Sequence, residues 1–194
     1  MEVVASRTQT SSHSLERAEN CVQELLLVLG ENPFREGLLD TPKRVVKAML
    51  ELCEGYHQTP ADILTTQFTE TCDEMVVVTN IPFWSLCEHH MLPFQGVATV
   101  GYLPQGKIVG LSKIPRLVQC FARRLQVQER LTQQIAHELH THTQSRGTAC
   151  VIKGQHTCMQ MRGIKSSGEM TTSCLLGTMR EEVSVRAEFL SFVN

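Results

Sequence analysis

Residues 75–103 read MVVVTNIPFWSLCEHHMLPFQGVATVGYL, and the interpretation of the chain starts from this stretch. The β-branched run from Met75 to Thr79 predicts a strand, which Pro82 is expected to interrupt. Residues 83–91 are expected at a strand end or bend. Residues 96–103 predict a second strand. The stretch therefore predicts two strands on either side of a segment rich in cysteine and histidine.

That segment is Cys87-Glu88-His89-His90, in which Cys87 and His90 have a spacing that lets both side chains reach one metal ion. The tripeptide His156-Thr157-Cys158 strengthens the prediction, because residues 156 and 158 share a face if they lie on a strand. Three ligands, Cys87, His90 and Cys158, would leave the fourth position of zinc open for water, as in catalytic sites. His89 and His156 would then lie beside the metal as proton-transfer groups. Either stretch alone is more simply explained by buried cysteines and satisfied histidines, whereas both together favour a metal.

The chain upstream of these strands is predicted to be helical. Residues 1–14 are rich in Ser and Thr without periodicity, which predicts a flexible tail. Apolar residues at helical spacing predict one helix over residues 15–29 and another that begins at Thr41, with Thr41 itself as the N-cap. We therefore expect an N-terminal helical region over residues 15–72, followed by one domain over residues 73–194.

The chain after residue 103 alternates between helical and extended patterns. Within the stretch before it, Trp84 is predicted to lie in the core. The predicted elements are helices that begin at Ser112 and span 131–139, one strand or two close segments over 148–152 and 156–161, a strand over 170–178, and a C-terminal helix over 182–192. Strands and helices that do not alternate one by one indicate an α+β fold with an antiparallel sheet.

Composition limits the classes of partner. The chain has 194 residues, of which 42% are hydrophobic, so one substantial domain with a helical appendage is expected. A net charge of -2 gives no reason to expect nucleic acid or a membrane surface as partner. No apolar run approaches a membrane span and no signal-peptide pattern is present. Eight cysteines without a CxxC pair are then expected to be reduced thiols of a cytoplasmic protein.

A second candidate site lies at the start of the helix that begins at Ser112. Lys113 and Arg116 are three residues apart and share a face in its first turn. Cations are unfavourable at a helix N-terminus, so a nearby anion would resolve the conflict, although a solvated helix face is the simpler alternative. Arg162, four residues after Cys158, would add a cation on the metal face if the strand continued.

Other polar residues leave alternatives open. Glu129 can accept two N–H bonds from a guanine-like edge and Gln128 can donate to a carbonyl, but Glu129 alone is more simply a first-turn residue that complements the helix dipole. The histidines His137, His140 and His142 are a rival metal cluster, but their spacing does not place all three on one helix face. Glu88 is either a general base or a charge at the rim of the site.

These motifs together resemble the GTP cyclohydrolase I family, with a similarity that runs from about residue 31 to the C-terminus. The matching segments are residues 73–76, 87–90, 110–113, 126–132 and 156–159, with Arg116, Arg162 and Gly163. The resemblance implies the tunnelling fold (T-fold), in which a four-stranded antiparallel sheet packs with two helices. It also implies a homodecamer of two pentamers, with active sites at subunit interfaces.

The family converts GTP and water to formate and 7,8-dihydroneopterin triphosphate, the first step towards tetrahydrofolate and other pterins. The resemblance implies one zinc ion per subunit, bound by Cys87, His90 and Cys158, with His89 and His156 as acid–base residues. It further implies that the triphosphate and guanine are bound by Leu111, Ser112, Lys113, Arg116, Gln128, Glu129 and Arg162.

Three other classes of protein compete with this interpretation. A related nitrile reductase acting on a deazapurine would use a nucleophilic cysteine without zinc. A zinc-stabilised binding module would need a fourth protein ligand, which the sequence does not supply. A regulatory paralogue would bind GTP without turning it over, although every motif residue is present.

Overall fold

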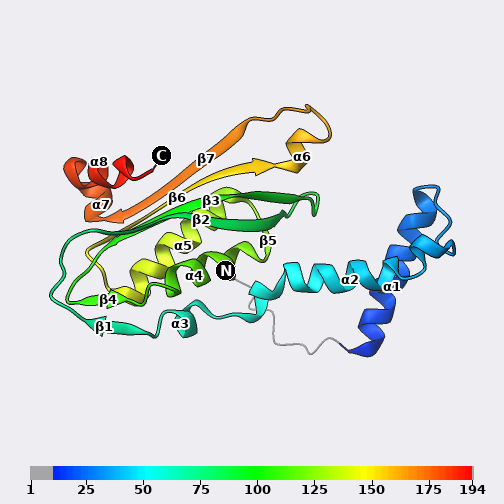
Figure 1. Cartoon of the computed structure of the whole chain (residues 1–194), viewed down its shortest axis with the longest axis horizontal. Helices are drawn as coiled ribbons and strands as arrows, with labels where there is room; N and C mark the ends of the chain where they lie inside the picture. Colours follow the sequence, from blue (N-terminus) through cyan, green and yellow to red (C-terminus); the bar gives the residue numbers. More distant parts are fainter. Residues whose placement is uncertain (1–10, 194) are drawn as a thin grey trace. The chain divides into compact units, whose positions relative to one another are not determined.

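The structure is a computed structural model that describes residues 11–193 (Figure 1). Residues 1–10 of the predicted flexible tail lie outside the described residues, and from Ser12 onwards that segment is helical rather than irregular. The described chain divides into two compact units, Met1–Cys53 and Glu54–Asn194. No helix within residues 11–193 has the length and apolar character required to span a bilayer.

The first unit consists of α1 (Ser12–Val28), the 3-10 turn η1 (Glu36–Leu38) and α2 (Thr41–Leu52). Asp40 rather than Thr41 is the N-cap of α2, and a proline lies in its first turn. The two α-helices contact each other, but no residue of either is buried. Apolar side chains such as Val28 and Phe34 are largely exposed.

The second unit holds the sheet and the helices that cover it. Its elements are η2 (Glu54–His57), α3 (Pro60–Ile63), β1 (Gln67–Thr69), β2 (Val76–Cys87), β3 (Pro93–Leu103), β4 (Lys107–Val109), α4 (Lys113–Ala122), β5 (Leu125–Gln126), α5 (Gln128–Thr143), β6 (Gly147–His156), α6 (Thr157–Gln160), β7 (Glu169–Gly177), α7 (Thr178–Glu181) and α8 (Val183–Ser191).

Within residues 54–193, five strands form one sheet in the order β5-β2-β3-β6-β7. The four long strands pair antiparallel, and the short β5 extends the edge by parallel pairing with β2. The strands β1 and β4 form a separate two-stranded ribbon. The predicted α+β class is therefore confirmed, whereas the sheet has one more strand than the four predicted.

Two predictions within β2 were wrong. The strand continues through Pro82, because a register shift between Val78 and Ile81 accommodates the irregularity while pairing with β3 resumes beyond it. Trp84 is 55% exposed, whereas its neighbour Phe83 is buried. Consecutive residues of a strand point to opposite faces, so Trp84 lies on the face away from the core.

The main core lies between the sheet and the two long helices α4 and α5, which cover one of its faces (Figure 1). A smaller cluster around Phe189 of α8 packs on strand residues outside the main core. Strand pairing places Leu86 opposite Pro93 and Phe94 opposite His156. The end of β2, the start of β3 and the end of β6 consequently lie side by side, where these three central strands meet the same end of the sheet.

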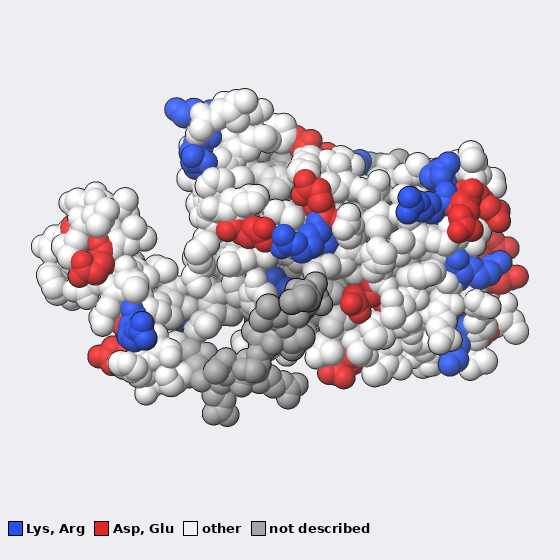
Figure 2. Space-filling model, turned by 180° about the vertical axis from the view of Figure 1, so that it is seen from behind, with Lys and Arg blue, Asp and Glu red and all other residues white. Residues whose placement is uncertain are grey.

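The small net charge gives no reason to expect a general electrostatic field. Acidic and basic side chains are mixed over the face shown in Figure 2, in keeping with the net charge of -2. An anionic ligand must therefore be held by a local group of Lys and Arg side chains.

Candidate metal centre

The loop between β2 and β3 brings Cys87 and His90 together. The amide of Cys87 donates to Leu92 O, and the amides of His90 and Met91 both donate to Cys87 O. Met91 adopts a left-handed conformation with φ 55°, which closes the turn. As a result, Cys87 Sγ and His90 Nδ1 lie 3.8 Å apart.

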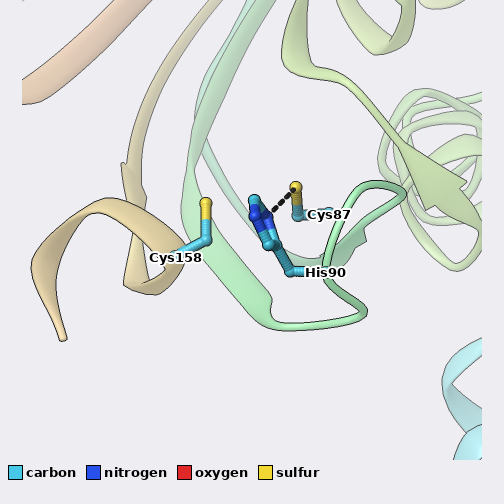
Figure 3. A group of neighbouring side chains, drawn as sticks. All are labelled: Cys87, His90 and Cys158. Atoms are coloured by element: carbon cyan, nitrogen blue, oxygen red, sulfur yellow. Dashed lines mark hydrogen bonds between the residues drawn. The ribbon is translucent and has the colours of Figure 1, made fainter. Parts of the chain in front are cut away.

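The third side chain of the group comes from α6 rather than from a strand. The sequence prediction that Cys158 shares a strand face with His156 was wrong, because β6 ends at His156 and residues 157–160 form a helical turn. Thr157 anchors this turn by donating to Pro93 O at 2.6 Å. The turn directs Cys158 towards Cys87 and His90 from the opposite side (Figure 3).

The three ligand atoms lie within 4.8 Å of one another, and in the described part of the chain no other group of three or more Cys, His, Asp or Glu side chains is as suitably placed for a metal. Tetrahedral zinc with bonds of about 2.0–2.3 Å would separate its ligands by roughly 3.5–3.8 Å. The distance between Cys87 Sγ and His90 Nδ1 already has that value. Two sulfurs and one imidazole nitrogen are a donor set that suits zinc.

Metal binding at this site is coupled to the loss of a proton from Cys158. Burial raises the pKa of the Cys158 thiol, and the adjacent Cys87 raises it further by charge repulsion and hydrogen bonding. A thiol in this environment stays protonated at neutral pH without a cation. A coordinated metal reverses this preference, because the thiolate is the ligand.

His89 lies beside the metal group, and His156 lies at the end of β6, where the chain turns towards Cys158. His89 Nδ1 is 3.8 Å from Cys87 Sγ, although His89 does not join the three-residue group. His156 stacks on Phe94 with ring centroids 4.6 Å apart. Burial lowers the pKa of His156, and the charge of Glu129 raises it to a smaller extent. His156 is therefore neutral at pH 7 and can accept a proton.

Arg130, which sequence reasoning did not single out, holds the ligand loop. Its guanidinium contacts both carboxylate oxygens of Glu88 at 2.5 and 3.0 Å. This hydrogen bonding and the positive charge lower the pKa of Glu88, which makes Glu88 a weak base. The amide of Glu88 also donates to Gln126 O, so the loop is attached both to β5 and to the first turn of α5. The signal in the sequence that could have pointed to Arg130 was the run of polar residues in the 126–132 segment.

Glu88→Gln is expected to weaken zinc binding about 10-fold, because residues that support metal ligands have effects of roughly this size. The ion pair with Arg130 requires an ionised Glu88, so its contribution is present above the ordinary carboxyl pKa and is lost as the pH falls through the lowered value. Competition with a chromogenic chelator at pH 7 measures the affinity. Glu31→Gln is the matched control, since it removes the exposed Glu31–Arg35 pair. Equal zinc affinity in both variants would contradict the anchoring role.

The predicted phosphate-binding residues lie away from the metal group in the same chain. Leu111 and Ser112 precede α4, and Lys113 and Arg116 lie in its first turn. The opposite end of α4 leads into Gln126, which pairs with Cys87. Ten helical residues span roughly 15 Å, so the first turn of α4 is about that far from the metal end.

The remaining predicted residues differ in their surroundings. Glu129 is exposed in the first turn of α5, whereas Gln128 is buried, with its amide against backbone carbonyls and His156. Arg162 is exposed and contacts His90 Nε2 at 3.1 Å, although it does not lie on a strand as predicted. The rival histidines do not form a metal group among the described residues, and His142 instead contacts Glu138 at 2.9 Å.

Comparisons with known proteins agree with this site. The family profile described as GTP cyclohydrolase I matches residues 18–194, so the similarity begins upstream of the predicted start at residue 31. The chain is 55% identical over 174 residues to GTP cyclohydrolase 1 1 of Pseudomonas syringae pv. tomato, covering 89% of this chain and 93% of that protein. It is 51% identical over 175 residues to GTP cyclohydrolase 1 of Coxiella burnetii (strain Dugway 5J108-111), covering 89% and 95%.

A solved structure, the archaeosine synthase QueF-Like in the apo form, has a TM-score of 0.42 and 14% identity over 51% of this chain and 91% of that chain. A likeness this low supports no statement about function.

Proposed function

The chain belongs to the GTP cyclohydrolase I family, and from this membership we propose that it converts GTP and water to 7,8-dihydroneopterin triphosphate and formate. The observation that carries the proposal is the group Cys87, His90 and Cys158, with His89 and His156 beside it, in a chain 55% identical to a GTP cyclohydrolase 1. We propose the tunnelling fold for its sheet and helices, and the first step of pterin or folate synthesis as its role.

The resident metal that the donor set favours is zinc, held by Cys87, His90 and Cys158. When bound, zinc supplies Lewis acidity that brings the pKa of a coordinated water towards neutrality. Three protein ligands leave one position for that water, whereas a structural zinc site would use four.

The histidines supply the proton transfers that the rearrangement needs. Opening the imidazole ring of guanine requires a proton at N7, and the later ribose opening and pterin closure require further transfers. His156, neutral and partly buried, accepts protons, and His89 next to the ligand Cys87 is the second proton-transfer group. Two histidines in different surroundings allow acid and base roles to be divided.

We assign guanine recognition to Glu129. Gln128 is the other residue predicted to contact guanine. An exposed carboxylate accepts two N–H bonds from the guanine edge and leaves a partner unpaired when adenine binds. Arg162 donates to His90 Nε2 in the structure. Arg162 is exposed, so its guanidinium would be available to a phosphate of GTP.

The phosphate-binding residues come from a second copy of the chain, because Ser112, Lys113 and Arg116 lie about one helix length from the metal group of their own chain. The exposed apolar side chains of α1 and α2 supply surface for such an assembly. We propose a homodecamer in which each site combines the metal group of one subunit with the first turn of α4 from another.

Lys113→Ala is expected to raise the KM for GTP about 10- to 100-fold, since a charge-assisted contact contributes roughly 1.5–3 kcal/mol. The value of kcat should change less, because the metal group and histidines are intact. Lys107→Ala is the control, as it removes an exposed lysine from the neighbouring β4. An unchanged KM for Lys113→Ala would contradict the phosphate contact.

Mixing subunits tests whether the site is shared. Co-assembly of equal amounts of Cys158→Ala and Lys113→Ala chains would give about a quarter of the sites a full set of residues when each site uses two chains. Activity at low GTP should then rise above that of either variant alone. If each site belonged to one chain, mixing would restore nothing.

Incubation of the zinc-loaded protein with GTP tests the activity itself. Formate and a product that fluoresces as neopterin after oxidation are expected in equal amounts. A zinc-binding module or a regulatory paralogue would give neither, and a nitrile reductase would contain no zinc.

A further inference from the structure

Gln128 is the first residue of α5. Its side chain contacts β6 and β7 and lies next to His156, the last residue of β6. The side chain is buried, with 1% of its surface exposed. Its Nε2 lies 3.2 Å from Ile152 O and 2.9 Å from Met170 O, two backbone carbonyls that can only accept. This orients the amide, so Oε1 is the atom that faces His156 Nε2 at 2.9 Å.

Two threonines complete the network. Thr132 donates to Gln128 O at 2.7 Å, so its oxygen must accept in the 2.6 Å contact with Thr172 Oγ1. Thr172 then donates its own proton to Thr132 and accepts from Gln128 Nε2 at 3.1 Å. The two hydrogens of Gln128 Nε2 are shared among three acceptors, Ile152 O, Met170 O and Thr172 Oγ1, and this leaves Gln128 Oε1 as an acceptor for His156.

Strand β6 has a glycine, Gly154, at the point where it passes the Gln128 amide. A Cβ on Gly154 of β6 would lie 2.3 Å from Gln128 Oε1 and 3.2 Å from its amide carbon. Any residue other than glycine would therefore displace the oxygen that contacts His156. Phe94 fixes the plane of the same ring by stacking at an interplanar angle of 9°.

We propose that Gln128 is a positioning residue that holds His156 with its proton on Nε2, so that His156 exchanges protons with the substrate through Nδ1. An amide oxygen cannot donate, so His156 Nε2 must carry hydrogen to make this contact. In the neutral ring, Nδ1 is then the nitrogen without a hydrogen, so it is the one that accepts. The catalytic part of this proposal rests on the proposed function, whereas the tautomer does not.

This role differs from a direct contact between Gln128 and guanine in a measurable way. A positioning residue acts on the chemical step, so Gln128→Met should lower kcat about 10- to 100-fold while the KM for GTP stays within about twofold and zinc content stays at one per chain. A guanine contact would instead raise KM.

A milder variant keeps the test valid if Gln128→Met folds poorly. Thr172→Val removes one of the three acceptors of the Gln128 amide without touching His156, and should lower kcat about 2- to 10-fold, the equivalent of one neutral hydrogen bond. Thr148→Val is the matched control, because Thr148 lies on the neighbouring β6 and donates to Ala136 O of the same helix α5. Its kcat should match that of the parent.

The tautomer is read directly from nitrogen NMR of zinc-loaded protein with 15N-labelled histidine, in which protonated and bare ring nitrogens have well separated shifts. The signals of His156 are those missing from His156→Asn. We expect Nε2–H in the parent and a mixture of tautomers in Gln128→Met. Nδ1–H in the parent, an unchanged kcat in folded Gln128→Met, or a rise in KM alone would overturn the proposal. A parent without activity on GTP would contradict the proposed function, while the nitrogen shifts would still decide the tautomer.

Discussion

Cys158→Ala is expected to lose zinc and all measurable turnover of GTP while the fold is retained. The two remaining ligands, Cys87 and His90, cannot hold zinc with the affinity of three. Cys158 is only partly buried and lies in a four-residue helical turn, so truncation leaves little cavity in the core. Zinc per chain, circular dichroism and formate release are measured on the same preparation.

The matched control for this variant is Cys174→Ala. Cys174 is also partly buried and also packs at the margin of the main core, but it lies on β7 outside the metal group. We expect Cys174→Ala to keep one zinc per chain and near-parental activity. Full zinc occupancy in Cys158→Ala would show that Cys158 is not a ligand.

His156→Ala is expected to lower kcat about 100- to 10,000-fold, the range that a positioned proton-transfer group contributes. The variant should keep zinc and bind GTP, because His156 lies outside the metal group. Loss of the ring also removes the stacking on Phe94 and leaves Gln128 Oε1 without its donor, so a modest loss of stability accompanies the kinetic effect.

His89→Ala should fail at a different chemical step. His89 lies beside Cys87, whereas His156 lies at the end of β6 in contact with Gln128. At least one of the two variants is expected to accumulate a ring-opened formamide intermediate, visible by chromatography. If both histidines only supported metal ligands, both variants would bind zinc about 10- to 100-fold more weakly and trap nothing. His137→Ala, which removes an exposed histidine of α5, is the control.

The proximity of Cys87 and His90 and the fold class were predictable because they depend on local patterns. The spacing of Cys87 and His90 and the β-branched residues of β2 are visible in the sequence. The path of the chain around Cys158 was not, because the sequence does not show where β6 ends and α6 begins. The exposure of Trp84 depends on which face of β2 the helices cover, which is a tertiary property.

Roles that depend on long-range contacts were beyond sequence reasoning. Gln128 reads as a polar residue at a helix start, and only the pairing of β6 with β7 reveals that its amide is taken by backbone carbonyls. Likewise, Arg130 became part of the site only through its contact with Glu88, which is 42 residues away in the chain. The separation of Lys113 from the metal group required the direction of α4 in the fold.

The most direct test of the central claim, that Cys87, His90 and Cys158 form the catalytic metal centre, is a zinc titration of the metal-free protein with formate release as the readout. Activity should rise in proportion to zinc and reach its maximum at one zinc per chain, with Cys158→Ala inactive throughout. Full formate release by the metal-free protein, or an equal response in Cys158→Ala, would contradict the account.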